Sequence, residues 1–529
     1  MRQWVTDPDT VKRASIHYCR EERDTKHLST ERLCLGIIER LTDHLLYVIQ
    51  NSKLTVPEVC GVLFHPNCMH YLGVPLTHNV LWKLPLPERK QFRPIVDSTG
   101  KSLKMLHLTD THMDLWYTPG SNSLCDESVC CRSTSYGHNH SAGVWAESRF
   151  LCDASLEFAD DSIRHMAEQH RDLDFVIWTG DNTPHDEWNS TREINLRSIS
   201  LMTDTVRSAF GPKIPVYPCL GNHEPHPFNL YVPYVASVDS NGTFSMNWLY
   251  ETLADNYWHQ WIGTSEANRK SFTTGGYYSA MINKGLKIVV LNNNICQHRN
   301  YWIAYSPVDP DGQLQWLIDQ LDSAESDGIY AMIITHVPPY EYRDCYLAWT
   351  DNYFRIVERY EHLLVGSYFG HTHNDEIVIL YNKNATTNAT YPIGHGYVGP
   401  SVTPWAYHNA GYRVFQLDGT GKPFDFTMYY TNVTQDNIDG RQVRPKWTVG
   451  YSARESYRMT ELSTSEWDGL LSRALTDDRL LDLYFSHLRR FSEAFVDKMI
   501  DQNIYDRKHI REMYVKSRKV VNPINELIK

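Results

Sequence analysis

The chain has 529 residues, with 51 Lys+Arg against 63 Asp+Glu, so its formal net charge is −12 when histidine is counted as neutral. This acidic balance argues against a stable nucleic-acid partner, because phosphate backbones attract basic surfaces. A hydrophobic fraction of 42% excludes wholesale disorder. No apolar run approaches the roughly 18 residues that a transmembrane helix needs.

The N-terminal part is expected to be helical. Residues 31–50 carry apolar side chains at three- and four-residue spacing, which predicts an amphipathic helix. A second short helix should begin at Thr55, which can cap it, with Pro57 in its first turn, carry Cys60 and end near Cys68. Residues 73–101 contain four prolines and few periodic apolar positions, a pattern typical of a stiff linker.

Beyond residue 101, short apolar runs alternate with helical stretches, which predicts an α/β layered domain. The expected strands cover residues 103–108, 174–178, 214–220, 286–291, 330–335 and 365–369. Residues 412–418 and 425–433 are expected to form a hairpin, and residues 465–516 are expected to be helical.

Potential metal ligands follow five of these runs. They are Asp110 and His112, Asp181, Asn222, His336, and His371 and His373. In open α/β sheets ligands gather at the carboxyl ends of the strands, and mixed oxygen and nitrogen donors suit zinc, manganese or iron. One such residue after a strand is more often part of a turn than a ligand. Five groups in order favour a metal site.

The same residues resemble the calcineurin-like metallophosphoesterases, whose D-x-H, GD, GNH[DE], H and GHxH motifs occur here in order. The resemblance implies a four-layer α/β sandwich with two metal ions. Asp181 would bridge the two ions, an arrangement suited to in-line displacement at phosphorus. The implied ligands are Asp110, His112, Asp181 and His373 for one ion, and Asp181, Asn222, His336 and His371 for the other.

Longer segments are similar to the acid sphingomyelinases, among them GDNTPHD, YFGHTHNDE, NAGYRVFQLD and WTVGYSARESY. The pair Cys60 and Cys68 resembles the end of a saposin-type domain. This resemblance implies a partial saposin-like domain at 1–72, a proline-rich linker at 73–101, a catalytic domain at 102–440 and a helical C-terminal domain at 441–529. It also implies that two Zn²⁺ ions catalyse the hydrolysis of membrane sphingomyelin to ceramide and phosphocholine.

Two alternatives remain open at this point. A sphingomyelinase-like phosphodiesterase acting on nucleotides or other phosphate esters shares the metal motifs. A lipid-binding protein with a vestigial metal site is a further possibility, although all seven ligand positions are filled.

Two departures from the family pattern bear on the substrate. Met113 stands where a tryptophan is expected, and Arg299 stands where an acidic residue is expected.

The resemblance also assigns roles beside the metals. His223 would be the general acid for the leaving alkoxide and His185 its partner, although both could serve only as support for the ligands. Trp405 would contact a quaternary ammonium through a cation–π interaction, unless it is an ordinary packed loop residue.

Disulfides are implied by position, in the pairs Cys19–Cys34, Cys125–Cys130, Cys131–Cys152 and Cys296–Cys345. Cys60 and Cys68 would pair with a C-x-x-C that the sequence lacks, and no signal peptide is present. We therefore expect that the chain starts partway through its first domain. Cys219, inside an apolar run, is expected to be a buried free thiol.

Six N-x-[ST] sequons, together with the cysteines, favour a secreted or lysosomal protein, which we expect to be monomeric. In an acidic compartment the histidines outside the site would protonate and carry the net charge above zero, so anionic lipid surfaces would attract the protein. A helix pair exposing Ile38, Leu45 and Val62 could press on a membrane, or could simply close against the catalytic core. The sequons are at Asn139, Asn189, Asn241, Asn384, Asn388 and Asn432.

Overall fold

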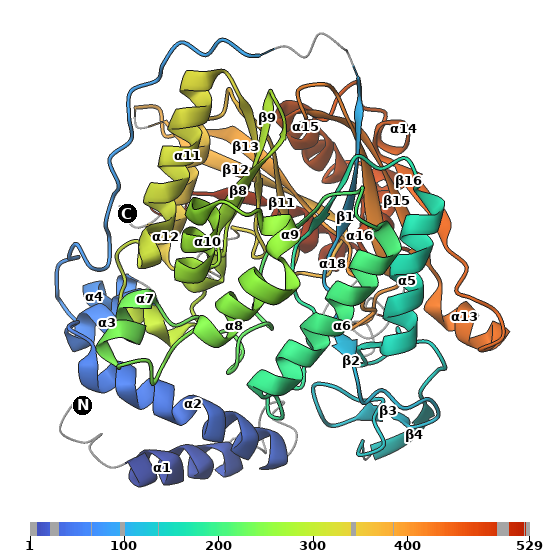
Figure 1. Ribbon diagram of the computed structural model, residues 1–529, viewed down its shortest axis with the longest axis horizontal. Coiled ribbons are helices and arrows are strands. Elements are labelled where there is room, and N and C mark those ends of the chain that lie inside the picture. The colour runs from blue at the N-terminus through green and yellow to red at the C-terminus, as the bar shows by residue number, and fades with distance from the viewer. Residues whose placement is uncertain are drawn as a thin grey trace.

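Two β-sheets and the helices that cover them form the body of the molecule, which is described by a computed structural model (Figure 1). The described residues are 8–21, 31–64, 66–95, 101–135, 137–339, 345–384, 386–492, 494, 507–522 and 524. Within them, no helix combines the length and the apolar character needed to cross a bilayer.

The first sheet has six strands in the order β16 (Thr448–Ser452), β15 (Pro423–Thr431), β14 (Ala410–Leu417), β1 (Leu103–Leu108), β6 (Phe175–Trp178) and β7 (Val216–Pro218). The second has seven, in the order β17 (Lys519–Val521), β12 (Glu376–Lys383), β13 (Thr390–Val398), β11 (Leu364–Phe369), β10 (Tyr330–Ile334), β9 (Leu286–Val290) and β8 (Tyr278–Asn283). The expected strands and the β14–β15 hairpin are therefore confirmed.

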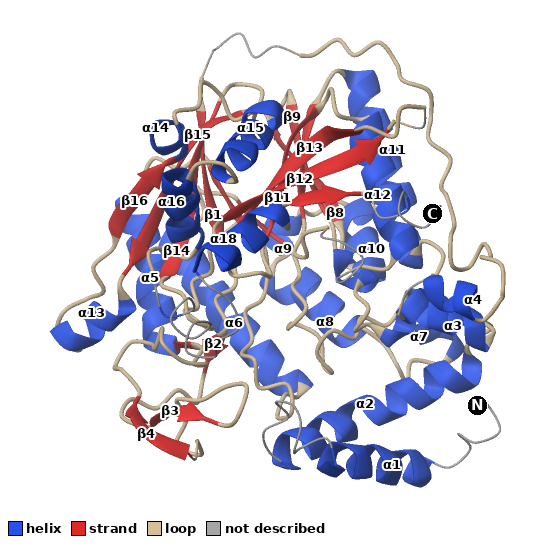
Figure 2. Cartoon of the chain, turned by 180° about the vertical axis from the view of Figure 1, so that it is seen from behind, coloured by secondary structure: helices blue, strands red, loops and turns tan. Residues whose placement is uncertain are grey.

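Successive side chains of a strand point to opposite faces of its sheet, which explains how the layers pack. In β1, Met105 joins the core shared by both sheets, whereas Leu106 and Leu108 pack outward with residues of α5 (Leu156–Gln169) and α6 (Arg192–Phe210). Helices α11 (Gln313–Asp327) and α12 (Leu347–Arg359) contact strands of the second sheet. Two packed sheets between outer helices are the expected four-layer sandwich, which the structure confirms (Figure 2).

Shorter elements fill the connections between the layers. Two small sheets pair β2 (Met113–Asp114) with β5 (Ala154–Ser155) and β3 (Asn122–Cys125) with β4 (Gly137–Ser141). The helices α7 (Tyr234–Asp239), α8 (Asn247–Thr252), α9 (His259–Ile262) and α10 (Glu266–Gly275) lie between β7 and β8 in the chain, and α13 (Val433–Asp439) follows β15.

The N-terminal segment contains α1 (Pro8–Glu21), α2 (Glu31–Asn51), α3 (Val56–Leu63) and α4 (Asn67–Tyr71). Thr55 caps α3 as expected, in a capping box with Glu58. The predicted single helix reaching Cys68 is wrong, because α3 ends at Leu63 and α4 follows it.

Two expectations about the same segment are corrected by the structure. Cys60 and Cys68 are bonded to each other, so they do not need a C-x-x-C partner. Val62 is only 1% exposed and packs in the main core, so it cannot face a membrane. Ile38 and Leu45 are partly buried on α2.

The proline-rich residues 73–95 form no helix or strand and run past α11 and α12 on the outside of the molecule (Figure 1). They are held by side chains of α12. Asn352 accepts a hydrogen bond from the Leu84 N–H at 2.8 Å, and Arg359 donates to the carbonyl oxygen of Pro87 at 2.7 Å. The segment is thus an extended strap along the catalytic region.

The C-terminal region is less purely helical than expected. It contains α14 (Ala453–Tyr457), α15 (Thr464–Ala474), α16 (Asp478–Leu488) and α18 (Arg507–Lys516), but β16 and β17 from the same region extend the two sheets. Helix α15 packs on β12 and β13 through buried side chains such as Trp467 and Leu471. The region is therefore integrated into the sandwich.

Disulfides join Cys125 to Cys130, Cys131 to Cys152 and Cys296 to Cys345, the pairs that the resemblance implied. The implied Cys19–Cys34 pair involves the side chain of Cys19, which lies outside the described residues. Cys219 is a buried free thiol, as expected.

Candidate metal centre

The seven ligand-type residues meet at one edge of the sandwich. β1, β6 and β7 run parallel in the first sheet, and β9, β10 and β11 run parallel in the second. Each ligand follows the carboxyl end of one of these strands, in loops that turn abruptly. The backbone takes a positive φ at Asp110 (47°), His112 (38°), Asp181 (57°), His371 (74°) and His373 (61°).

The glycine before Asn222 is needed for close approach. A Cβ on Gly221 would lie 2.0 Å from Asp181 Oδ1, so any larger residue would collide with that carboxylate. Gly180 instead has a positive φ of 89° before Asp181. These positions let loops from neighbouring strands bring their side chains together.

The first group of ligands consists of Asp110, His112 and His373, all buried. His112 Nε2 lies 3.1 Å from His373 Nε2, and His373 Nε2 lies 3.5 Å from Asp110 Oδ1. His112 Nε2 is also 3.5 Å from Asp181 Oδ2, which connects this group to the second one.

The second group consists of Asp181, Asn222, His336 and His371. His336 Nε2 lies 3.0 Å from Asp181 Oδ2 and 3.0 Å from Asn222 Oδ1. His371 Nδ1 is 2.8 Å from the same amide oxygen. Asp181 Oδ2 therefore faces imidazoles of both groups, as a carboxylate shared between two ions would.

Backbone carbonyls fix the tautomers of three ligand histidines. The Nδ1–H groups of His112, His336 and His373 donate to the carbonyl oxygens of Thr183, Thr179 and Trp405 at 2.7, 2.6 and 2.7 Å. A carbonyl can only accept, so each Nδ1 carries a hydrogen, and Nε2 is the nitrogen that faces the cluster and is left to bind a metal once it is deprotonated. This second contact is typical of metal-binding imidazoles.

The cluster requires positive charge at its centre. Burial lowers the pKa of His112 and of His336, but Asp110 and Asp181 outweigh burial and raise both to about 9. The facing His112 and His373 nitrogens must have a proton or a cation between them. The oxygen and nitrogen donors thus fit two divalent ions, which would replace those protons.

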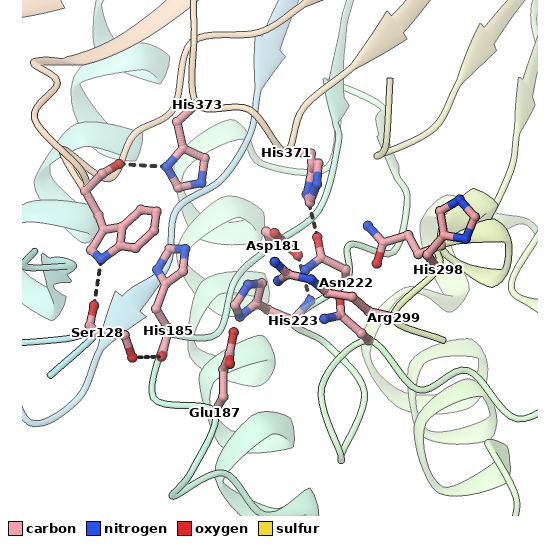
Figure 3. Close-up of a pocket in the computed structure, with 13 residues that line it drawn as sticks. Ser128, Asp181, His185, Glu187, Asn222, His223, His298, Arg299, His371 and His373 are labelled. Carbon is pink, nitrogen blue, oxygen red and sulfur yellow. Dashed lines mark hydrogen bonds between the residues drawn. The ribbon is translucent and has the colours of Figure 1, made fainter. Parts of the chain in front are cut away.

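His185 and His223 lie beside the ligands (Figure 3). The ring of His185 stacks between His112 and Trp405, at centroid distances of 4.0 and 3.8 Å, and lies 4.7 Å from the ring of His223. Burial lowers the pKa of both His185 and His223. The structure therefore brings both histidines, and Trp405, to the metal ligands.

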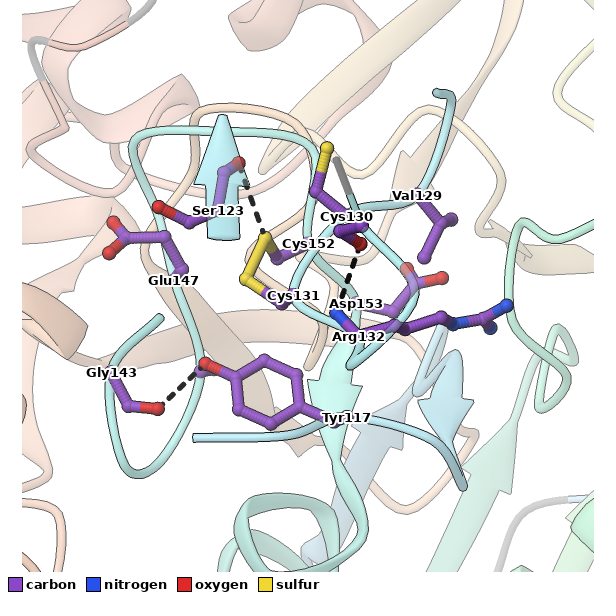
Figure 4. The surroundings of a disulfide bond; sticks show 12 residues. Tyr117, Ser123, Val129, Cys130, Cys131, Arg132, Gly143, Glu147, Cys152 and Asp153 are labelled. Atoms are coloured by element: carbon purple, nitrogen blue, oxygen red, sulfur yellow. Dashed lines mark hydrogen bonds between the residues drawn. A yellow bond between two sulfur atoms is a disulfide. The ribbon is translucent and has the colours of Figure 1, made fainter. Parts of the chain in front are cut away.

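Asp153 orients His185 and is the main residue that sequence reasoning missed. Its Oδ1 lies 2.8 Å from His185 Nδ1, and its Oδ2 accepts the His185 backbone N–H at 2.8 Å. The disulfide Cys131–Cys152 lies directly before Asp153 (Figure 4). Asp153 is far from the motifs in sequence, so only its adjacency to a bonded cysteine could have indicated it.

Glu224, the last residue of the GNHE motif, holds the two loops together. Its carboxylate accepts the backbone N–H groups of Gly221, Asp181 and Asn182 at 2.5, 3.1 and 2.6 Å. Burial raises its pKa to about 7. It ties the Asp181 loop to the Asn222 loop and is not itself a ligand.

A cavity of about 380 Å³ opens above the ligands. The expected ammonium-binding residue Trp405 lines it, and so does Arg299. Met113 is fully buried in the core instead, so this departure from the family pattern does not touch the cavity. The cavity is lined by Ser128, Asp181, His185, Glu187, Asn222, His223, Asn229, Gln297, His298, Arg299, His371, His373 and Trp405.

The fold and this site define a dinuclear phosphoesterase. Residues 103–375 match the family model described as calcineurin-like phosphoesterase. The chain is 34% identical to "Sphingomyelin phosphodiesterase" of Homo sapiens over 467 residues, covering 86% of this chain and 70% of the relative. It is 30% identical to "Sphingomyelin phosphodiesterase 2" of Caenorhabditis elegans, covering 85% and 75%.

A further relative is "Acid sphingomyelinase-like phosphodiesterase 3b" of Mus musculus, with 29% identity covering 72% of this chain and 81% of that protein. On these findings the chain belongs to the sphingomyelin phosphodiesterase family of calcineurin-like phosphoesterases, and it is a phosphoric diester hydrolase.

Proposed function

We propose that the protein hydrolyses sphingomyelin to ceramide and phosphocholine with two zinc ions. The observation that carries the proposal is the meeting of two ligand groups at Asp181, at the base of a cavity that also contains His185 and His223. The relatives named sphingomyelin phosphodiesterase support the choice of substrate. One ion would take Asp110, His112, Asp181 and His373, and the other Asp181, Asn222, His336 and His371.

When bound, the two ions would acidify water and neutralise charge on the phosphoryl oxygens. The protein supplies the remaining groups. The ceramide alkoxide is a poor leaving group and needs a proton, which His223 would donate from beside the ligand Asn222. His223 is positioned through its backbone, since its N–H donates to Asp181 Oδ1 at 2.9 Å.

His185 would assist as the second proton-transferring group. Because Asp153 accepts its Nδ1–H, its Nε2 is left to hold or release a proton. Trp405 covers the ring of His185, and its indole N–H donates to the carbonyl oxygen of Ser128 at 2.9 Å. Trp405 would therefore serve the substrate's ammonium group as an aromatic wall of the cavity.

We further propose that the protein is secreted or lysosomal and works as a monomer on membranes, including anionic surfaces at acidic pH. Disulfides and exposed sequons support the secreted or lysosomal location. Five sequon asparagines have exposed side chains, and the side chain of Asn139 is not described. The exposed ones are Asn189, Asn241, Asn384, Asn388 and Asn432.

A second candidate is hydrolysis of nucleotides or other phosphate esters. It is favoured by Arg299, whose guanidinium lines the cavity and would attract an additional anionic group.

The test assays purified protein on sphingomyelin liposomes and on a nucleoside triphosphate, before and after chelation and after adding back zinc or manganese. We expect phosphocholine release that chelation abolishes and zinc restores. Preferential cleavage of the triphosphate would favour the second candidate. No turnover of either substrate by metal-loaded protein would refute both.

A further inference from the structure

The cavity above the metal ligands is lined by two acidic side chains, Asp181 and Glu187. Asp181 is one of the proposed metal ligands. Glu187 is half-buried and makes no ion pair or side-chain hydrogen bond within the described part of the chain. Figure 3 shows it beside His223, among the residues around the cavity. The cavity thus contains a carboxyl group that the proposed reaction does not use.

The neighbouring residue shows that this isolation is specific. Asp186 points back into the protein, where its Oδ2 lies 2.8 Å from Arg132 Nη1. Arg132 also donates from Nε and Nη2 to Asp114 Oδ2 and Oδ1, at 2.8 and 2.9 Å. Two consecutive acids therefore have opposite surroundings: Asp186 is paired in the interior, and Glu187 lines the cavity with no cation of the described residues within ion-pair distance.

The positive group near Glu187 is Arg299, which is exposed and lines the same cavity. The two side chains are not within ion-pair distance of each other, yet they interact electrostatically. Burial raises the pKa of Glu187 to about 8, and the charge of Arg299 opposes that rise without cancelling it. A cation placed in the cavity would stabilise the ionised carboxylate further.

We propose that Glu187 binds the ammonium group of the substrate headgroup and that Arg299 opposes this binding, so that the pair sets headgroup specificity. The inference rests on the proposed function, because it assumes that phosphate binds at the metal ligands. In phosphocholine and phosphoethanolamine the ammonium lies two carbons beyond the ester oxygen, which keeps it in the cavity that holds the phosphate. A bound ammonium favours the ionised form of Glu187, so the cavity distinguishes a headgroup that carries an ammonium from one that does not.

The test is isothermal titration of the metal-loaded protein with phosphocholine, phosphoethanolamine and methyl phosphate. Methyl phosphate is a phosphate monoester without an ammonium group, so the ratio of Kd values isolates ammonium recognition. We expect Glu187→Gln to reduce the advantage of the ammonium ligands over methyl phosphate about tenfold and Arg299→Gln to increase it.

Glu193→Gln is the matched control, because Glu193 is an exposed acid on α6 outside the cavity. It should leave the ratio unchanged. Metal content and Tm of each variant show that it is folded. An unchanged ratio in Glu187→Gln, or a lower ratio in Arg299→Gln, would overturn the proposal.

Comparing phosphoethanolamine with phosphocholine also shows how Glu187 recognises the ammonium group. A larger Glu187 effect on phosphoethanolamine indicates hydrogen bonds from its N–H groups, and a larger effect on phosphocholine indicates charge contact together with Trp405. Sphingomyelin hydrolysis is measured separately. Glu187-dependent binding without that hydrolysis would refute the proposed substrate and leave the ammonium site standing, whereas hydrolysis with an unchanged binding ratio would refute the ammonium site alone.

Discussion

At the scale of single residues, the proposed reaction divides the site into residues that would hold metal and residues that would move protons. The imidazole of His223 makes no hydrogen bond within the described part of the chain, and its backbone N–H anchors the residue to Asp181. Its imidazole is therefore available for chemistry.

His223→Gln should lower kcat on sphingomyelin by about 10²- to 10⁴-fold, because the alkoxide leaves without a proton. Its effect on bis(p-nitrophenyl) phosphate should be much smaller, since nitrophenolate leaves unprotonated. Steady-state kinetics on both substrates, at equal metal content, provide the measurement. Equal losses on the two would assign His223 to ligand support instead.

Asp153→Asn tests the orientation of His185. The variant weakens the charge that stabilises protonated His185, so we expect kcat to fall about 10²-fold with little change in KM. Asp204→Asn, an exposed acid on α6, is the control and should have no effect. Loss of bound metal in Asp153→Asn, rather than loss of turnover at full occupancy, would contradict a role through His185.

At the scale of elements, the residues after α16 reach the metal centre. Arg490 is fully buried and donates hydrogen bonds to the carbonyl oxygens of His373 and Asn409. A C-terminal element thereby fixes the loop that carries the GHxH ligands. Sequence periodicity could not reveal this, because Arg490 has no motif around it.

Arg490→Met should leave buried carbonyls without donors and destabilise the protein by about 1–3 kcal/mol. It should also weaken metal binding by loosening His373. Thermal unfolding and metal titration measure the two effects. Arg479→Met, an exposed arginine on α16, is the control. Unchanged metal affinity in the Arg490 variant would mean that the His373 loop holds its position unaided.

The N-terminal helices depend on a second buried charge, Glu58. Burial raises its pKa, but hydrogen bonds from Thr55, Thr77 and Asn79 outweigh burial and lower the pKa from 4.5 to about 2. Glu58 thus ties the start of α3 to the strap that follows α4.

Glu58→Ala should cost about 1–2 kcal/mol near neutral pH through loss of the capping box. Because the folded pKa lies below the unfolded one, the stabilisation is complete above about pH 5 and declines as the pH falls towards 2. The difference in Tm between wild type and variant should therefore narrow between pH 6 and about 3. If the difference in Tm stayed constant over that range, the ionised Glu58 carboxylate would not be the source of the stabilisation. Glu39→Ala, an exposed acid on α2, is the control.

At the scale of the whole molecule, burial limits the charge reversal expected in acid. Burial lowers the pKa of many histidines outside the site, so they stay neutral near pH 5. Attraction to anionic lipid must then come from the remaining histidines and from carboxylate protonation. The affected residues are His44, His107, His165, His170, His226, His395, His408 and His487.

Metal binding should release protons and stabilise the whole fold. His112 and His336, with pKa values near 9, are protonated at pH 7 in the metal-free protein and must be neutral as ligands. Zinc titration in two buffers of different ionisation enthalpy should therefore give different apparent enthalpies, and chelation should lower Tm. Identical apparent enthalpies in both buffers would contradict the protonated state of His112 and His336 in the metal-free protein.

The sequence by itself determined the strands, the order of the ligand motifs and the family, because apolar alternation and residues at strand ends are local patterns. It could not determine the partner of Cys60, the burial of Val62, or the surroundings of Asp153, Glu187 and Arg490. Those depend on which distant segments pack together, and the contact of a side chain from another loop or helix leaves no periodic signal. Only the tertiary structure decided them, since charge, burial and hydrogen-bond partners are properties of the assembled site.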